Sequence, residues 1–264
     1  MNGNTLPDLT SQRVLIPGGT GAVGDGIVRN YLAAGAEVVV PTRTQHRADE
    51  FRAVLGDAAS ERLHLVVHDY TTFAGAEDLA AQMQSNLGGI DHVVAPIGGW
   101  WSGKRLWEID ESDWDSAFVG LATAHMAVAR AVLPRLTRDG TYTVTVGASS
   151  SWPVPGSGLA SMEQAAVLMM QQVVLAELDG KRRAFAIVLG PVSSRAARGE
   201  PNWVTAEEVG RVLVGISADS TIAGRVIDMT GVTQISAALG LVSAERSTKT
   251  DTDTDTDTVP SPGS

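Results

Sequence analysis

The stretch VLIPGGTGAVGDGIV, residues 14–28, decides the fold. Its first three residues are apolar and predict a short buried strand, the glycines between residues 18 and 26 predict a sharp turn, and the apolar spacing that follows predicts a helix. A glycine turn between a strand and a helix lets a pyrophosphate reach free backbone N–H groups at the helix N-terminus. We therefore expect a dinucleotide to bind at this turn; the alternative is a tight turn that binds no ligand.

The same alternation of strands and helices continues to about residue 229. Near-continuous apolar runs, typical of strands buried on both faces, occur at residues 14–16, 38–40, 63–67, 92–95, 142–146, 185–189 and 226–227. Helical spacing occurs at residues 24–34, 48–55, 77–87, 113–136, 160–178 and 206–217. Thr205 and Glu208 have the spacing of a capping box before the last of these. The alternation predicts the α/β class: a Rossmann-type, doubly wound sheet of about seven parallel strands with helices on both faces.

Length and composition are those of one ordinary globular domain. The chain has 264 residues, 44% of them hydrophobic and 19% charged, which excludes a rod, a coiled coil and disorder throughout. We expect an N-terminal extension at residues 1–12, a single domain at residues 13–240 and a disordered Thr/Asp-rich tail at residues 241–264. The tail lacks the glycine turn and terminal glutamate of a calcium loop, although it holds Asp251, Asp253, Asp255 and Asp257.

Charge and cysteine content restrict the partners. A total of 20 Lys and Arg against 30 Asp and Glu gives a net charge of −10, so we expect neither nucleic acid nor a membrane as a partner. Because the chain has no cysteine, thiol chemistry and cysteine-based metal sites are excluded, and no metal site is expected. The start of the chain lacks the apolar stretch of a signal peptide, and no apolar run has the length of a membrane span. We expect a cytoplasmic protein.

The end of the second predicted strand bears on which dinucleotide binds. An NAD site usually carries an acid there, whereas this chain has Thr42 and Arg43. An arginine at that place pairs with a ribose 2′-phosphate, so NADP(H) is favoured unless Arg43 is simply solvated. Asp69 follows the third strand and is placed either to contact an adenine ring or to form the turn that starts a helix.

Four motifs together resemble the short-chain dehydrogenase/reductase family. They are the glycine turn, IDHVV at residues 90–94 before two glycines, Leu133-Pro134 at the end of a long helix, and Gly190-Pro191-Val192 after the sixth strand. The resemblance implies a Rossmann-type fold, a bound nicotinamide cofactor, and a homodimer or homotetramer built on the two long helices. It assigns the cofactor contacts to Gly18, Thr20, Gly21, Val23, Gly24, Thr42, Arg43, Asp69, Gly98 and Pro191.

The resemblance also implies a catalytic set of Asn, Ser, Tyr and Lys, which this chain does not have. The corresponding positions are Leu121, Gly147, Ala160 and Gln164. None of these side chains can do the family's proton chemistry, so the catalytic residues are unknown; Ser149 or Ser150 would replace the serine if the loop shifts. Cofactor-side positions differ as well, because Pro17 has no backbone N–H and Ala95-Pro96-Ile97-Gly98 stands where the family has Asn-Asn-Ala-Gly.

Other side chains near these positions are possible substitutes. His125 lies one helical turn beyond Leu121, where packing is its more common role, and Glu163 points about 100° away from Gln164 around the helix. Three tryptophans fall in loops that ring the substrate pocket in the family. They form either an aromatic wall for a flat, apolar small molecule or a packing layer under surface loops; they are Trp100, Trp101 and Trp152.

We interpret the chain as a divergent short-chain dehydrogenase/reductase-like protein that binds NADP(H) and lacks ordinary dehydrogenase catalysis. Three alternatives stay open: an NADP(H)-dependent oxidoreductase with substituted catalytic groups, a repurposed fold with non-redox chemistry such as cyclisation or dehydration, and a nucleotide-sensing or binding protein without chemistry. The sequence separates them poorly, because the loss of a catalytic set is visible in a sequence and the gain of another is not.

Overall fold

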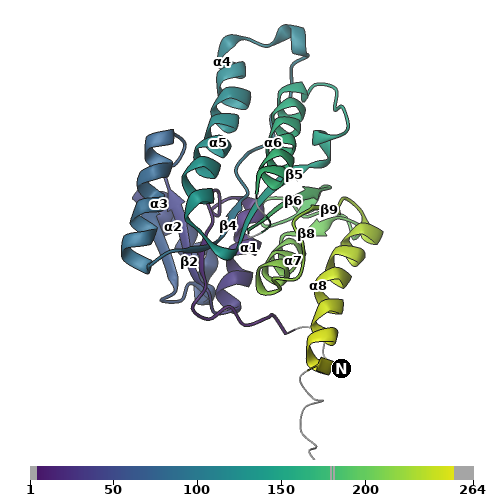
Figure 1. Ribbon diagram of the computed structural model, residues 1–264. Helices are drawn as coiled ribbons and strands as arrows, with labels where there is room; N and C mark the ends of the chain where they lie inside the picture. The colour runs from purple at the N-terminus through teal and green to yellow at the C-terminus, as the bar shows by residue number, and fades with distance from the viewer. Residues whose placement is uncertain (1–4, 179, 181, 253–264) are drawn as a thin grey trace, which may run out of the picture.

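Seven parallel strands form the central sheet of the computed structural model, which describes residues 5–178, 180 and 182–252. The order across the sheet is β3-β2-β1-β4-β5-β6-β9, and every neighbouring pair is parallel (Figure 1). This confirms the predicted Rossmann-type sheet. The strands are β1 (Arg13–Leu15), β2 (Glu37–Thr42), β3 (Leu63–Val67), β4 (Ile90–Ala95), β5 (Leu136–Gly147), β6 (Arg183–Leu189) and β9 (Val226–Met229).

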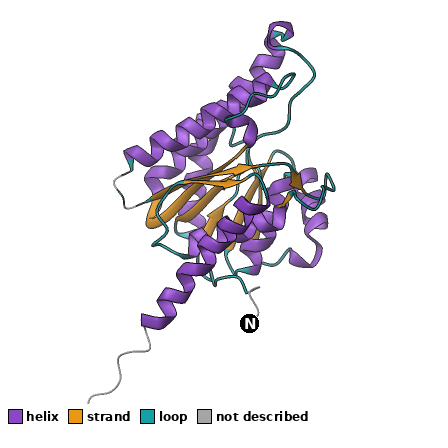
Figure 2. Ribbon diagram, turned by 90° about the vertical axis from the view of Figure 1, so that its right-hand side faces the viewer, coloured by secondary structure: helices purple, strands orange, loops and turns teal. Residues whose placement is uncertain are grey.

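Helices cover both faces of this sheet, as predicted (Figure 2). The apolar residues of one group of helices share a core cluster with one face; these helices are α1 (Ala22–Ala33), α2 (Gln45–Leu55), α7 (Ala206–Ala218) and α8 (Val232–Thr252). A second cluster on the other face is shared by α3 (Phe73–Leu87), α5 (Gly120–Val132) and α6 (Gly158–Glu177). The capping box predicted before α7 is present between Thr205 and Glu208.

The strands are apolar at successive positions because both faces are covered. At β1, Val14 and Ile16 belong to the first cluster, whereas Leu15 belongs to the second. Successive side chains of a strand point to opposite faces of a sheet. A strand with a polar alternate position would bury polar groups under one of the two helix layers, so the near-continuous apolar runs indicate a parallel sheet.

The long helix predicted at residues 113–136 is interrupted, and a small sheet was not predicted. The helix consists of α4 (Glu111–Trp114), a π-helical turn η3 (Asp115–Val119), α5 and a 3-10 turn η4 (Leu133–Arg135). The small sheet pairs β7 (Val192–Ser193) with β8 (Val204–Thr205) in parallel. Strands of two residues leave no periodic signal in a sequence, which is why they escaped prediction.

The boundary predicted for the tail, residue 241, falls inside helix α8, which continues to Thr252. An apolar stripe holds the part of this helix up to residue 243 to the domain: Ile235, Ala238 and Val242 are buried. Val242 lies so close to α7 that a Cβ added at Gly215 would lie 2.4 Å from it. Asp251 falls within α8, whereas Asp253, Asp255 and Asp257 lie outside the described residues.

The N-terminal extension is packed against the domain where the structure describes it. Leu9 belongs to the first core cluster, and its N–H donates to the carbonyl of Ala34 at 2.7 Å. Residues 1–4 lie outside the described range. The extension therefore adds an apolar anchor at the end of α1 rather than a separate unit.

Two helical stretches are long and apolar enough to cross a membrane, Glu111–Arg135 and Gly158–Glu177. They are longer than the apolar runs recognised in the sequence, because a few polar residues interrupt each of them. Length and composition are the only basis for this test, and core helices pass it too. In the folded protein α5 and α6 contact each other, and α6 lies on β5 and β6.

Candidate functional site

The loops that carry the predicted cofactor residues meet at one edge of the sheet. The carboxyl ends of all strands of a parallel sheet lie at the same edge, and ligands bind there at the point where the strand order reverses. In this chain that point lies between β1 and β4. The glycine turn follows β1, and Arg43, Asp69, Gly98 and Pro191 follow β2, β3, β4 and β6. The fold thus brings these residues to the edge where a dinucleotide would lie.

The glycine turn approaches its neighbours too closely to carry side chains. Gly18 has a φ of +87°, and a Cβ there would lie 2.5 Å from the carbonyl oxygen of Pro96. A Cβ at Gly24 would lie 2.5 Å from the carbonyl oxygen of Gly19. Both positions therefore require glycine. A ligand at this turn would meet backbone rather than bulky side chains.

The turn leads directly into α1. Gly21 is the N-cap and supplies no side-chain cap, and the first helical bond runs from the Asp25 N–H to the Gly21 carbonyl at 3.0 Å. The backbone N–H groups of residues 22–24 therefore have no partner inside the helix. Together with the helix dipole they favour an anion such as a pyrophosphate. Thr20 and Val23, two further predicted contacts, flank this cap.

The residues at the ends of β2 and β3 differ in burial and in hydrogen bonding. Thr42 is buried, and its hydroxyl donates to the Thr44 carbonyl at 2.9 Å. Arg43 is exposed. Asp69 accepts from the hydroxyl of Thr71 at 2.6 Å and from its N–H at 2.9 Å. These bonds hold the pKa of Asp69 below its usual value, and electrostatic interactions with His68 and Arg43 add to the effect. Asp69 thus forms the turn before α3, and its contact with adenine stays a prediction.

Tyr70 also belongs to this region, and the sequence analysis missed it. It packs at the margin of the second core cluster. Burial raises the pKa of its phenol, whereas the Arg43 charge and the backbone of Gly18 lower it. Tyr70 is therefore close enough to the glycine turn and to Arg43 for both to affect its pKa. In the sequence, its position directly after Asp69 is the signal that could have indicated its place near the glycine turn.

The family's catalytic positions do come together, but an uncharged network fills them. The Gln164 Oε1 atom accepts from the Gly147 N–H at 2.7 Å and from the Ser149 hydroxyl at 2.8 Å. Ala160 is 3% exposed, and Leu121 packs against the second core cluster. This arrangement joins the end of β5 to α6. It contains no group that titrates near neutral pH.

The two serines proposed as substitutes differ in their partners. Both lie in the 3-10 turn η5 (Ala148–Ser150) that follows β5. The Ser149 hydroxyl is used in its bond to Gln164. The Ser150 Oγ atom is buried and has no hydrogen-bond partner within the part of the chain that the structure describes. Of the two, only Ser150 has a hydroxyl that could turn to a ligand without breaking a bond seen here.

His125 and Glu163 face each other behind this network. The His125 Nε2 atom lies 3.0 Å from the Ile97 carbonyl oxygen. Because a carbonyl only accepts, Nε2 carries the hydrogen and Nδ1 is the bare acceptor. Nδ1 is buried and, among the described residues, has no partner. Glu163 Oε1 lies 3.8 Å from His125 Nε2 and is likewise buried and unpartnered in the described ranges.

Burial disfavours the charged form of both members of this pair. It raises the pKa of Glu163 to about 7. It lowers the pKa of His125 to about 4, against a smaller opposing effect of the Ile97 hydrogen bond. His125 is therefore neutral at pH 7 and the pair is not an ion pair, although the two atoms are close. Glu163 is thus an acid beside the catalytic positions that titrates near neutral pH.

Exposed aromatic side chains lie in the loops that follow β4 and β5. Trp100 is 65% exposed and Trp152 is 72% exposed, while Trp101 is half-buried. Their loops are joined, since the Gly103 N–H donates to the Gly156 carbonyl at 2.9 Å. Trp107, which the sequence analysis did not single out, is 79% exposed beside the same loops. In Figure 1 the end of the long helix labelled α4 projects beyond the sheet.

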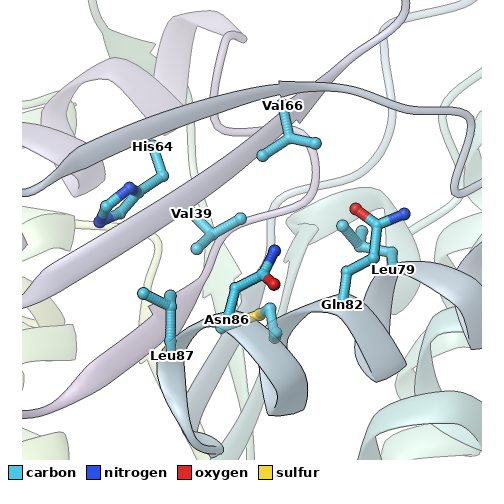
Figure 3. A pocket seen from close by; sticks show the side chains of 8 residues that line it. Val39, His64, Val66, Leu79, Gln82, Asn86 and Leu87 are labelled. Atoms are coloured by element: carbon cyan, nitrogen blue, oxygen red, sulfur yellow. The ribbon is translucent and has the colours of Figure 1, made fainter.

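Two cavities lie away from this edge. Figure 3 shows the smaller one, about 120 Å³, where side chains of β2 and β3 such as Val39 and Val66 face Leu79 and Asn86 of α3. The larger, about 450 Å³, is lined by polar residues at the amino ends of the strands, among them His92 and Arg183. Neither contains a predicted cofactor or catalytic position.

The comparisons with known proteins place most of the chain in one family. A family model described as Enoyl-(Acyl carrier protein) reductase matches residues 19–248. The Hydroxysteroid 11-beta-dehydrogenase 1-like protein of Xenopus tropicalis is 29% identical over 150 residues, 56% of this chain and 51% of the relative. The NADP-dependent 3-hydroxy acid dehydrogenase YdfG of Escherichia coli strain K12 is 25% identical over 169 residues, 63% of this chain and 66% of the relative. The matches thus span half to two thirds of these relatives.

A solved structure supports the fold over a larger share. The short chain oxidoreductase of Pseudomonas aeruginosa PAO1, described as containing an atypical catalytic center, superposes with a TM-score of 0.75 at 20% identity. The superposition covers 84% of this chain and 97% of that one. At this identity the likeness concerns the fold alone.

Glu163→Gln is expected to change how stability depends on pH. The folded pKa lies above the unfolded one, so the stabilising contribution of the neutral acid is complete below about pH 4.5 and is lost as the pH rises through about 7. The variant should therefore match the wild type near pH 4 and exceed it at pH 8 by up to roughly 3 kcal/mol. Urea unfolding at both pH values measures this, with Glu177→Gln, an exposed change on the same helix, as the control. Equal pH profiles for the wild type and Glu163→Gln would contradict it.

Proposed function

The chain belongs to the short-chain dehydrogenase/reductase family of oxidoreductases, and on that premise we propose that it is a divergent member that binds NADP(H) without the family's Tyr-Lys proton chemistry. One contrast carries the proposal. The glycine turn keeps a backbone site in which side chains are excluded at Gly18 and Gly24. At the catalytic positions, the Gln164 carbonyl oxygen is already bonded to Gly147 and Ser149.

The residues present fit the phosphate side of a nicotinamide dinucleotide. The unpaired N–H groups at the start of α1 would bind the pyrophosphate. The exposed Arg43 guanidinium would pair with the 2′-phosphate. The phenol of Tyr70, whose pKa is raised by burial and affected by Arg43, would lie against the adenine. One relative carries NADP dependence in its name, which supports the same choice. We accordingly infer NADP(H) over NAD(H).

The residues present do not fit the proton-transfer side. NADPH supplies a hydride when bound, but a carbonyl oxygen also needs a proton donor within hydrogen-bond reach and with a pKa near the working pH. Ala160 and Gln164 offer none. Glu163, with a pKa of about 7, has such a pKa, but it is buried with its carboxyl group beside His125. We infer that binding has been kept and that ordinary carbonyl reduction has been lost.

A second candidate is an NADP(H)-dependent oxidoreductase in which Ser150 takes the position of the proton donor. The observation that favours it is the buried Ser150 hydroxyl, which has no partner within the described residues. The alkoxide-like charge of a reduced carbonyl would need such a donor. The exposed tryptophans in the loops after β4 and β5 support an aromatic or apolar small molecule as the ligand of either candidate.

The proposal also includes a homodimer or homotetramer in the cytoplasm. The outer faces of α5 and α6 expose apolar side chains: Met126, Met162, Met169 and Val173. Exposed apolar residues on two adjacent helices are typical of a subunit interface. This interface would use the same two helices that satisfy the membrane-span test by composition.

Arg43→Ala is expected to weaken NADPH binding about tenfold and to change NADH binding less than twofold, because only NADPH carries the 2′-phosphate. Fluorescence titration of the reduced nicotinamide measures both affinities. Arg52→Ala, an exposed change farther along α2, is the matched control. If the wild type binds neither nucleotide at high micromolar concentration, the proposed function is wrong.

The wild type is expected to show no NADPH oxidation above background with a panel of simple ketones and aldehydes. The physical reason is the missing proton donor, since general acid catalysis contributes about 10²- to 10⁴-fold. Absorbance of the reduced nicotinamide follows the reaction. Robust turnover that Ser150→Ala abolishes and Ser149→Ala spares would instead favour the second candidate.

Met169→Glu is expected to convert the wild-type oligomer to a monomer, because a charge at the centre of an apolar interface would be desolvated without a partner. Light scattering after size-exclusion chromatography gives the mass. Val232→Glu, an equally exposed apolar position on α8, should leave the mass unchanged. A monomeric wild type at tens of micromolar would contradict the proposed interface.

A further inference from the structure

A single arginine from a distant part of the chain reaches the glycine turn. The Arg195 NH2 group donates to the Thr20 carbonyl at 2.8 Å, a contact between residues 175 positions apart. Its Nε atom lies 3.4 Å from the Asp25 carboxylate. Thr20 immediately precedes the cap of α1, and Asp25 lies in the first turn of that helix. Arg195 is therefore placed beside the N–H groups that would bind a pyrophosphate.

The loop around Arg195 is built to hold it there. Ser194 and Ala197 exchange backbone hydrogen bonds of 2.9 and 3.2 Å, which makes residues 194–197 a tight turn with Arg195 at its first corner. The Ser194 hydroxyl accepts from the Ala196 N–H at 3.3 Å. Just before this turn, β7 pairs with β8 at the start of α7. The backbone of Arg195 is thus positioned by bonds on both sides of the residue.

The charges around Asp25 favour an incoming anion. A carboxylate in the first turn of α1 opposes the attraction of the helix N-terminus for a second anion. Here Asp25 is buried between two guanidinium groups, with Arg29 at 2.8 Å on one oxygen and Arg195 at 3.4 Å on the other. Two positive charges and one negative charge leave the cluster net positive. Without Arg195 it would be neutral.

We propose that Arg195 is an anion-binding residue of the dinucleotide site, in which its guanidinium exchanges Asp25 for a pyrophosphate oxygen while keeping its bond to Thr20. The exchange is geometrically simple, because Asp25 retains Arg29 and the Arg195 side chain is 41% exposed. It would draw residues 190–203, the segment that follows β6, onto the bound cofactor. The inference rests on the proposed function and adds a residue to which the family resemblance assigns no cofactor contact.

The test compares Arg195→Ala and Arg195→Lys with Arg198→Ala. Arg198 is exposed in the same loop and makes no hydrogen bond or ion pair with any described residue. NADPH affinity is measured by fluorescence titration at several salt concentrations. We expect Arg195→Ala to weaken NADPH binding about tenfold and to lower its salt dependence, Arg195→Lys to lie between, and Arg198→Ala to stay within twofold of the wild type.

Inorganic pyrophosphate separates failure of this inference from failure of the proposed function. Trp203 packs against Gly199 in the same segment and should report binding through its fluorescence in the wild type but only weakly in Arg195→Ala. If Arg195→Ala binds NADPH as tightly as Arg198→Ala, or more tightly than the wild type, the inference is overturned and the proposed function stands. If the wild type binds neither pyrophosphate nor NADPH, both are overturned. Unfolding midpoints that agree among the variants exclude a folding defect, and Arg195→Lys provides the comparison if the alanine variant is unstable.

Discussion

The close approach of the glycine turn to the loop after β4 is the constraint on which the rest of the site depends. Gly18 can lie under the Pro96 carbonyl only without a side chain, and this contact joins β1 to β4 at the point where the strand order reverses. The first turn of α1 is aimed along that edge as a result. A second close approach, at Gly26 against Ala206, sets α1 against α7. Removing side chains at these positions lets backbone meet backbone, and so leaves backbone N–H groups for a ligand.

The two ends of the site differ in the kind of interaction that holds them. The end at the glycine turn is charged: Arg29 and Arg195 contact Asp25 in the first turn of α1, in a protein that is acidic overall. The catalytic end is neutral: an amide oxygen, a backbone N–H and a hydroxyl satisfy one another, and the acid behind them is buried beside a neutral histidine. A charged lysine in place of Gln164 would leave the Gly147 N–H without this acceptor. The hydrogen bonds from Gly147 and Ser149 therefore favour an uncharged side chain at position 164.

The fold was predictable from the sequence to the extent that burial leaves a periodic pattern. Val14, Leu15 and Ile16 indicate a strand covered on both faces; Val14 and Leu15 lie in β1, Ile16 directly follows it, and the three residues are divided between the two core clusters. The strands β7 and β8 were not predictable because two residues are too few to show a periodic pattern. In α8, the Thr/Asp repeat at the end of the helix obscured the apolar stripe that precedes it. At the candidate site, the sequence predicts only residues next to a motif, and it gives no signal for contacts made across the chain. Nothing near Arg195 in the sequence indicates Thr20, because that contact depends on how β6 and β1 lie in the sheet.

The π-helical turn at residues 115–119 has a consequence for engineering. A π turn takes in one residue more than an α turn, so it rotates everything before it by about 100° relative to the helix that follows. The 3.6-residue period, counted back from Pro134, assigns each side chain of α5 to a face of the helix. This assignment no longer holds from Val119 backward, where the π-helical turn begins. A polar residue grafted onto this helix to replace the family's asparagine would therefore face the site at Leu121 or one turn later. The same graft one turn earlier would point toward a different neighbour.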